Sequence, residues 1–336
     1  MAHLLESLKT EKITLSNRLV YPPIHIGKAE EDGKLNEDIL NYYDEKSKGG
    51  YIGLIIIEHS FINQEGKGSK KQISVADDNN NHMLKELATI IHKNNSKAVV
   101  QIGAAGSATN SEITGSQIIA PSPILNPSIS FLSPKMQQIP REISKEEIKK
   151  LIKDFKNAAK RVKDAGFDGV ELHSAHGYLL NQFYSPLTNK RTDEYGGDIL
   201  NRIRIHLQVI KAIKEVVGDD FPIFVRFAAY DSIEGGSTLQ DAKIAAKEFE
   251  KAGVNVLDIS AGMGANFLTI KDKIFFEEYT EKIKETVSIP VILTGGITDV
   301  NTAEKLLLEN KADLIGVGRA IFKDSMWAKN SIETLK

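Results

Sequence analysis

The sequence predicts a single α/β domain, a (β/α)8 barrel that occupies all of residues 1–336. Three observations favour it: eight short apolar runs rich in β-branched residues, helix-length amphipathic stretches between them, and glycines after the last two runs. With 41% hydrophobic residues, a chain of 336 residues can bury one core of that size. We expect the strands near residues 19–24, 52–58, 98–102, 169–173, 223–227, 254–260, 291–294 and 314–317.

The stretches between these strands carry the signals of amphipathic helices. Ser144 and Glu147 form a Ser-x-x-Glu capping box ahead of a helix with one apolar side, and Gly166 ends that helix just before the fourth strand. Residues 241–252 and 302–309 are expected to form two of the later helices. Helices that hand over to a strand within a few residues are typical of βαβ units and a parallel sheet.

Two segments lie outside the repeating pattern. Residues 1–17 contain an alternating stretch from Ile13 to Asn17, which predicts a strand or hairpin that closes the bottom of the barrel. Residues 103–143 follow the third strand and are rich in Ser, Pro, Gly and Asn. A loop of this length in a compact domain is usually functional, and after a barrel strand it covers the active-site face. We therefore predict a lid over a substrate site.

Composition excludes several classes of function. The net charge of −2 argues against general binding to nucleic acid or anionic membranes. The chain has no cysteine, which excludes disulfides, thiol nucleophiles and Cys-ligated metal centres. No segment has the apolar length of a signal peptide or a membrane span. We expect a cytoplasmic protein with a small-molecule substrate and no nucleic-acid or membrane partner; self-association into a homo-oligomer stays open.

Phosphate binding is predicted at the ends of the last two strands. Gly295 and Gly296 follow the seventh strand, and Gly318 and Arg319 follow the eighth. Barrels often bind phosphate there because glycine lets backbone N–H groups approach, and a guanidinium adds charge-assisted hydrogen bonds. Tight βα turns would explain either pair alone, but two pairs at consecutive strand ends favour phosphate. No G-x-G-x-x-G follows a strand and no P-loop motif occurs, so neither of those nucleotide sites is supported.

A second cluster of polar residues follows the fourth strand. His173 ends that strand, and His176 and Tyr178 come next on the loop. Two imidazoles and a phenol at a strand's carboxyl end can donate hydrogen bonds and carry protons. A structural His pair in a tight loop is the alternative. Arg226 ends the fifth strand, and a guanidinium inside a barrel needs an anionic partner, either a ligand or an interior acid such as Glu171.

The whole segment from 168 to 204 resembles the old yellow enzyme family. It contains H-x-x-H-G-Y at 173–178 and S-P-x-x-N-x-R-x-D-x-Y-G-G-x-x-x-N-R-x-R at 185–204, and the resemblance extends over roughly residues 4–327. Members of that family are ene reductases on a TIM barrel that bind flavin mononucleotide (FMN). The resemblance implies a ping-pong mechanism: NADPH or NADH reduces the flavin, and hydride then passes to the activated C=C of an α,β-unsaturated carbonyl.

The resemblance also implies roles for individual residues. His173 and His176 would hold the substrate carbonyl oxygen, and Tyr178 would protonate the α-carbon. Arg226 would lie beside the N1/O2 edge of the flavin, where negative charge develops on reduction, and Gln101 would bind the pyrimidine edge. The remaining cofactor residues would be Pro22, Pro23, Ile24, His25 and His59 around the ring and Gly295, Gly296, Gly318 and Arg319 at the phosphate.

Several residues depart from the family pattern near the ring. His25 stands where relatives carry Cys or Thr near flavin O4, and His59 occupies a position beside the flavin that is usually small. Gly27 replaces a substrate-side Tyr, and Ala104 and Ala105 replace the His-Ala of the common H-A-G. Because an imidazole near the flavin can change its charge between about pH 5 and 8, we predict a pH-dependent reduction potential. The departures leave the substrate range open.

Other functions remain compatible with the sequence. The same flavin barrel could use another oxidant (a quinone, a nitro compound, O₂ or a demethylation substrate), or bind flavin without turnover. A flavin-free phosphate-binding lyase or isomerase would need a lysine or carboxylate base at a strand end, and only Lys28 lies near one. No metal site is expected at His173 and His176, because no third ligand is evident. No motif distinguishes NADH from NADPH.

Overall fold

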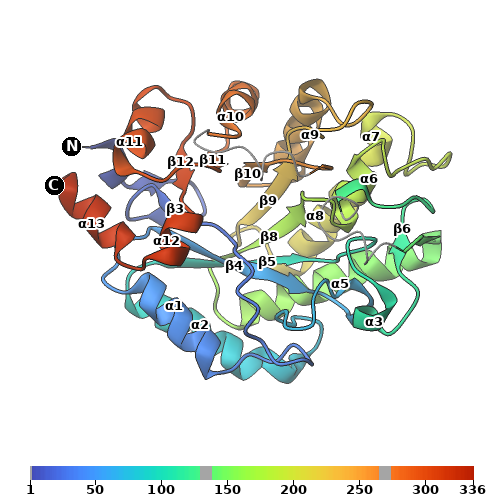
Figure 1. The fold of residues 1–336 in the computed structure, drawn as a ribbon, viewed down its shortest axis with the longest axis horizontal. Helices are drawn as coiled ribbons and strands as arrows, with labels where there is room; N and C mark the ends of the chain where they lie inside the picture. Colours follow the sequence, from blue (N-terminus) through green and yellow to red (C-terminus); the bar gives the residue numbers. More distant parts are fainter. Residues whose placement is uncertain (1, 129–137, 265–273) are drawn as a thin grey trace.

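The computed structural model describes residues 2–128, 138–264 and 274–336, and eight parallel strands in it close into a barrel wrapped by helices (Figure 1). The predicted (β/α)8 fold is confirmed. Around the barrel each strand pairs with the next one in the chain, and the last pairs with the first. The strands are β3 (Leu19–Tyr21), β4 (Leu54–Phe61), β5 (Lys97–Gly103), β8 (Gly169–Ser174), β9 (Ile223–Ala228), β10 (Val256–Ser260), β11 (Val291–Thr294) and β12 (Leu314–Gly316).

All eight expected strands are present, and the largest differences from the expected bounds are at the ends of β3 and β4. β3 stops at Tyr21 because Pro22 and Pro23, which lack a backbone N–H, follow it. β4 extends to Phe61, three residues beyond the expected end, and its pairing with β5 shifts register between Ile57 and Ser60. An irregularity of this kind re-aims the side chains beside it, here at the mouth of the barrel.

The helices cover the outside of the barrel, and α5 begins at its predicted capping box. Ser144 and Glu147 form the capping box of α5, and Thr238 and Asp241 form a second box that starts α9 two residues before the expected position. The longer helices are α1 (Glu37–Ser47), α2 (Asn81–Lys93), α5 (Lys145–Asp164), α8 (Arg204–Val217), α9 (Leu239–Ala252), α10 (Glu277–Lys284), α11 (Val300–Leu308) and α13 (Trp327–Thr334). Shorter ones are α3 (Ser111–Thr114), α6 (Leu179–Tyr184), α7 (Ile199–Arg202) and α12 (Arg319–Lys323). Within the described ranges no helix is long and apolar enough to cross a membrane.

The barrel interior is apolar toward the end where the strands begin (its lower part) and polar toward the end where they stop (its upper part). Its lower part is filled by side chains from every barrel strand except β8: Val20, Leu54, Ile56, Val99, Phe224, Val256, Ile292 and Leu314. Ile13 and Leu15 pack against this cluster from the hairpin β1 (Leu8–Lys9) and β2 (Thr14–Leu15), so the predicted closure of the bottom is confirmed. A larger apolar cluster packs between the strands and the outer helices.

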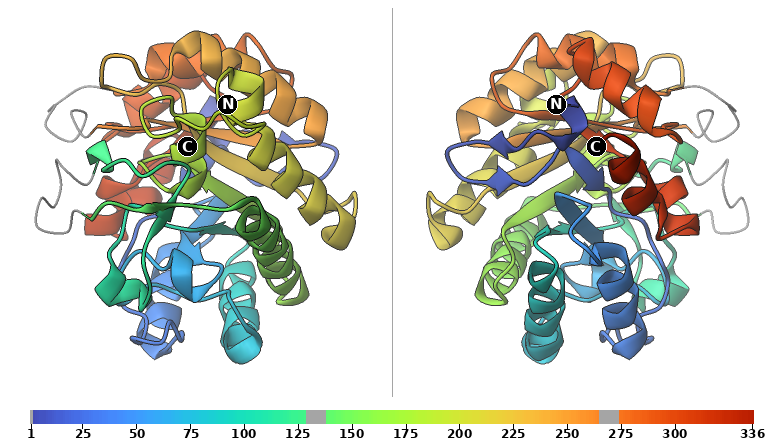
Figure 2. Two further views of the ribbon diagram at one scale, coloured as in Figure 1. Left: turned by 90° about the vertical axis from the view of Figure 1, so that its right-hand side faces the viewer. Right: turned by 90° about the vertical axis from the view of Figure 1, so that its left-hand side faces the viewer.

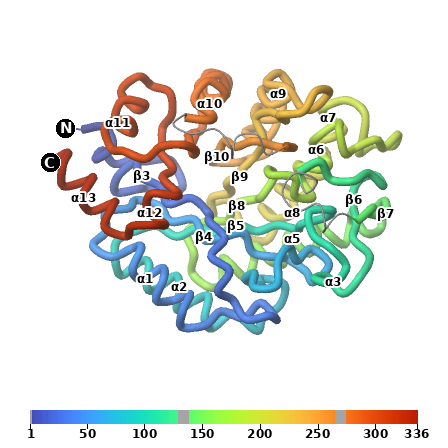
Figure 3. Tube along the Cα trace, viewed as in Figure 1, coloured from blue at the N-terminus to red at the C-terminus, as the bar shows by residue number. Residues whose placement is uncertain are grey.

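The segment after the third strand has secondary structure of its own. It contains α3 and a small parallel sheet of β6 (Ile119–Ala120) and β7 (Arg141–Glu142), while residues 129–137 lie outside the described residues. The side views place this segment and the N-terminal hairpin at opposite ends of the barrel (Figure 2). Its role as a lid stays a prediction. The tube shows the two ends of the chain on the same side of the barrel (Figure 3), and Ala2 and Lys336 line one groove there.

Candidate active site

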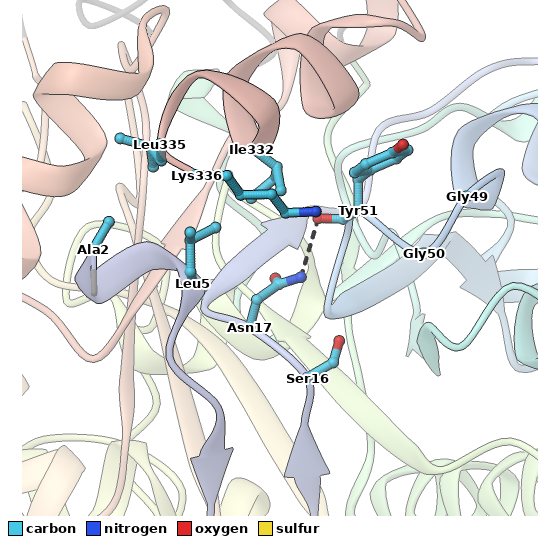
Figure 4. Close-up of a pocket in the computed structure, with 10 residues that line it drawn as sticks. All are labelled: Ala2, Leu5, Ser16, Asn17, Gly49, Gly50, Tyr51, Ile332, Leu335 and Lys336. Atoms are coloured by element: carbon cyan, nitrogen blue, oxygen red, sulfur yellow. Dashed lines mark hydrogen bonds between the residues drawn. The ribbon is translucent and has the colours of Figure 1, made fainter.

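A groove of about 700 Å³ lies at the end of the barrel where the strands begin (Figure 4). Asn17 bridges its floor, because its Nδ2 donates to the carbonyl of Tyr51 at 3.1 Å. The lining residues are Ala2, Leu5, Ser16, Asn17, Gly49, Gly50, Tyr51, Ile332, Leu335 and Lys336, without a carboxylate side chain or an imidazole. Barrel enzymes place their reacting groups where the strands end, so the site is expected at the opposite mouth.

The structure brings His173, His176 and Tyr178 together at the end of β8. Nε2 of His173 lies 3.4 Å from Nδ1 of His176, and the rings of His173 and Tyr178 have centroids 4.5 Å apart. His176 adopts a φ of 59°, a left-handed conformation that folds the loop back over the strand end. Its Nε2 lies 2.6 Å from the hydroxyl oxygen of Ser260, the last residue of β10.

The charges of these side chains follow from their burial. Burial lowers the pKa of His173 well below its usual range, and neighbouring imidazoles and Arg226 add to the effect. Burial, then the charge of Arg226, lowers the pKa of His176 in the same way. Burial raises the pKa of the Tyr178 phenol. At neutral pH the cluster therefore presents two neutral imidazoles and a neutral phenol, which can donate hydrogen bonds to an oxygen that gains negative charge.

His59, on β4, is a fourth ring in this cluster. Its centroid lies 4.9 Å from that of His173 and 4.4 Å from that of Tyr178. The N–H of Gly68 donates to Oε1 of Gln72 at 2.6 Å, so the amide nitrogen of Gln72 faces Nδ1 of His59 at 2.8 Å. The ring proton of His59 is therefore on Nε2, and burial lowers its pKa to about 3.

A hydrogen-bonded chain crosses the rim of the mouth from Ser69 through His25 to Glu58. The Ser69 hydroxyl lies 3.1 Å from Nε2 of His25, and Nδ1 of His25 lies 2.6 Å from Oε2 of Glu58. The Glu58 side chain is 0% exposed and that of His25 is 46% exposed. The sequence singled out His25 but neither partner. Alternation with Ile56 in β4 would have shown that Glu58 points inward.

Arg226 points into the upper part of the barrel, as predicted, and its partner there is Asp258 rather than Glu171. Nε of Arg226 lies 3.3 Å from Oδ2 of Asp258. The sheet register explains the choice, because Asp258 lies opposite Arg226 on β10 whereas Glu171 lies opposite Phe224. Glu171 instead accepts a hydrogen bond of 2.7 Å from Nε2 of Gln101, its neighbour on β5.

An open cavity of about 190 Å³ connects this region to the ends of β11 and β12. Gly295 lines it with a φ of 137°, and a Cβ there would meet the ring of Phe276 at 3.0 Å. The Arg319 guanidinium lies 5.7 Å from the ring centroid of Phe275. Predicted residues in the lining are Pro22, Pro23, Ile24, His176, Arg226, Gly295, Gly318 and Arg319, and the additional ones are Ser260, Phe275, Phe276 and Thr294.

The arrangement fits FMN. A guanidinium and glycine backbone lie at one end of the cavity, and a second guanidinium and an amide (Arg226 and Gln101) lie in the barrel mouth. Gly318 lies close to the ring-lining residues, since a Cβ there would approach Ile24 to 3.1 Å and Pro22 to 3.3 Å. A phosphate needs the first set of groups, and a ring that gains negative charge on reduction needs the second.

Three residues named from the sequence lie at the edge of this arrangement. Gly27 is beside His25, with a φ of 63°. Gly296 follows Gly295 with a φ of 81°. Nζ of Lys28 lies 5.9 Å from the ring centroid of Tyr42, and the residue is exposed. Lys28 therefore does not supply the inward amine that a flavin-free aldolase would need.

Comparison with known proteins gives a family match over almost the whole chain. The profile of the NADH:flavin oxidoreductase / NADH oxidase family matches residues 3–335. An NADH oxidase of Thermoanaerobacter brockii is 42% identical over 328 residues, which cover 96% of this chain and 49% of that protein. An NADPH dehydrogenase of Listeria monocytogenes is 35% identical over 336 residues, which cover 100% of this chain and 96% of that protein.

Solved structures give the same fold. A complex of 2-naphthoyl-CoA reductase with 2-naphthoyl-CoA superimposes with a TM-score of 0.92 at 26% identity, over 99% of this chain and 52% of that one. An old yellow enzyme homologue from Zymomonas mobilis gives 0.86 at 26% identity, over 99% and 93%. Among the curated relatives, the chain spans about half the length of the first two that it matches.

Proposed function

The chain belongs to the NADH:flavin oxidoreductase / NADH oxidase family, and from this we propose that it reduces the activated carbon–carbon double bond of α,β-unsaturated carbonyl compounds. One observation carries the proposal. Two neutral imidazoles and a neutral phenol, on His173, His176 and Tyr178, lie together at the mouth of a barrel that also holds two guanidinium groups. This is the set of donors that an enone needs as its carbonyl oxygen becomes an oxyanion.

Bound FMN would accept hydride from NADPH or NADH and supply it to the substrate. The N–H groups of His173 and His176 hold the carbonyl oxygen and stabilise the charge that grows there, an effect worth about 3 kcal/mol for one good donor. The hydroxyl of Tyr178, kept protonated by burial, gives its proton to the α-carbon. Arg226 would offset the negative charge that the flavin ring gains on reduction.

The chain's own residues would hold the cofactor in three groups. Gly295, Gly296, Gly318 and Arg319 bind the phosphate. Gln101 and Arg226 bind the pyrimidine edge of the ring, and Pro22, Pro23, Ile24, His25 and His59 surround it. The side of the ring that faces His173 and Tyr178 is then shared by the nicotinamide and the enone, so the two bind in turn.

The test separates the two half-reactions of the purified protein. It should show a flavin absorption spectrum that NADPH or NADH bleaches without oxygen and that cyclohex-2-enone restores. His173→Ala should slow the second step about 100-fold and leave the first largely intact. His82→Ala, at an exposed position on α2, is the matched control.

Two results would contradict the proposal. Equal loss in both half-reactions of His173→Ala would remove this residue from carbonyl binding. Rapid restoration of the spectrum by a quinone, a nitro compound or O₂ but not by any enone would replace ene reduction with another oxidant, while the family assignment would stand. The name of the Thermoanaerobacter brockii relative, NADH oxidase, makes O₂ the first of these to try.

A further inference from the structure

Three carboxyl groups lie in the upper part of the barrel interior, above the apolar cluster. Glu58 comes from β4, Glu171 from β8 and Asp258 from β10, and each residue is 0% exposed. They point inward for a common reason, because each stands two positions after an inward residue of its strand (Ile56, Gly169 and Val256). Two of them contact residues that would hold the flavin ring, since Asp258 lies beside Arg226 and Glu171 beside Gln101.

Two of the three carboxyls have a cationic or ionisable partner. Glu58 bonds to His25 at 2.6 Å and accepts a backbone hydrogen bond from Ile26. Asp258 has Arg226 at 3.3 Å, and its Oδ1 accepts a hydrogen bond of 3.1 Å from Thr294.

Glu171 forms no ion pair with the residues that the structure describes. Its Oε1 accepts a hydrogen bond from Gln101, whereas its Oε2 is buried and accepts none, as also holds for Oε1 of Glu58 and Oδ2 of Asp258.

A buried carboxylate without a counter-ion is costly, and a proton removes the cost. Burial raises the pKa of Glu171 well above its usual range, and the charge of Asp258 adds to the effect. Burial also raises the pKa of Asp258, but there Arg226 and then Thr294 act in the opposite direction. The groups that face Glu171 are Gln101 on β5, Arg226 on β9 and Asp258 on β10. Of the two acids, Asp258 is the one in contact with Arg226, and that contact favours its charged form.

We propose that Asp258 is the fixed counter-ion of Arg226, that Glu171 is a neutral acid which orients the amide of Gln101, and that the charge of Asp258 lowers the reduction potential of the flavin. The inference rests on the proposed binding of FMN. The Asp258 carboxylate partly neutralises the Arg226 guanidinium. Arg226 would then stabilise the negative charge of the reduced ring less, and the ring would give up hydride more readily. Glu171 occupies Nε2 of Gln101 and leaves its Oε1 free to accept from the pyrimidine N–H. Both acids act as positioning residues.

Two isosteric variants separate the roles of the acids, because each removes a carboxyl and keeps its shape. Asp258→Asn removes a charge beside Arg226. We expect the preference for reduced over oxidised FMN to rise about tenfold, a midpoint potential about 30 mV higher for this two-electron couple. Glu171→Gln replaces one neutral group with another, so its potential at pH 7 should match that of the wild type. Asp258→Ser removes the same charge with a smaller side chain and replaces Asp258→Asn if that variant does not fold.

A second measurement uses the protein without flavin. Folded Glu171 keeps a proton that an unfolded glutamate releases above pH of about 4.3, so its contribution to stability is lost as pH rises above that value. Urea unfolding of both apoproteins should therefore show the stability of the wild type falling relative to that of Glu171→Gln as pH rises above about 4.3.

The outcomes distinguish the two proposals. A wild-type potential in both Asp258 variants, or a rise in Glu171→Gln as large as that in Asp258→Asn, would overturn the inference while FMN binding stands. The same pH dependence of unfolding in Glu171→Gln and wild type would overturn the neutral state of Glu171. A chain that cannot be loaded with FMN would instead remove the proposed function, and the apoprotein measurement would still report on Glu171.

Discussion

Gly103, the last residue of β5, is the position at which one methyl group should disturb the candidate site most. A Cβ there would lie 2.8 Å from Nε2 of His59 and 3.1 Å from Cβ of His173. Both residues are buried, at 8% and 3% exposure. Because Cβ contacts under 3.0 Å essentially never occur, the His59 ring would have to move against Tyr178, whose centroid is 4.4 Å away. Overpacking of this kind costs about 1–3 kcal/mol.

We therefore expect Gly103→Ala to lower the free energy of unfolding by about 2 kcal/mol, a change of about 30-fold in the ratio of folded to unfolded protein. Urea denaturation of the apoprotein, followed by circular dichroism, measures this without any effect of cofactor. His59→Ala removes the atom that is too close, so Gly103→Ala should cost little in that background. The two changes should then show a coupling of about 1–2 kcal/mol in a double-mutant cycle. An equal cost in both backgrounds would refute the reasoning, as would no cost in either.

Three further predictions test the site and its surroundings. Tyr178→Phe should slow restoration of the flavin spectrum by an enone about 100-fold and leave a quinone unaffected, because a quinone needs no proton on carbon; stopped-flow traces that slow equally for both would argue against this role. Burial lowers the pKa of His206 to about 3, so the unfolded chain binds a proton there first and stability falls as pH drops from about 6.5 to about 3. His206→Gln should reduce the total loss of stability over this pH range by at most about 5 kcal/mol, and an unaltered pH dependence in urea titrations would contradict it. His25→Thr should change how the flavin potential depends on pH between about pH 5 and 8, and identical potential curves for variant and wild type would exclude His25 as the cause.

The fold was predictable because its signals are local. Continuous apolar runs such as that in β4 identify buried parallel strands, and the Ser144–Glu147 box marks a helix start within four residues. The stop of β3 at Tyr21 also follows from local chemistry, since two prolines come next. The extension of β4 to Phe61 does not, because it depends on a register shift against β5 that only the packed sheet reveals.

The candidate site was predictable to the extent that its residues are adjacent in sequence. His173, His176 and Tyr178 lie within six residues and were foreseen as one group. The partner of Arg226 was not, because 32 positions separate it from Asp258 and only the register of β9 and β10 makes them neighbours. The same holds for Ser69, which reaches His25 across 44 positions, and for Gln72, which sets the tautomer of His59. Non-local hydrogen bonds leave no pattern in a single sequence.

The closed bottom of the barrel determines how reactants enter and leave the candidate site. Ile13, Leu15 and the apolar cluster above them seal one end, so the described part of the barrel interior opens at the other end, where the candidate site lies. Under the proposed function the electron donor would leave by that end before the electron acceptor enters. Excess of either reactant would then inhibit turnover, so the rate would depend on the ratio of the two as well as on the amount of each.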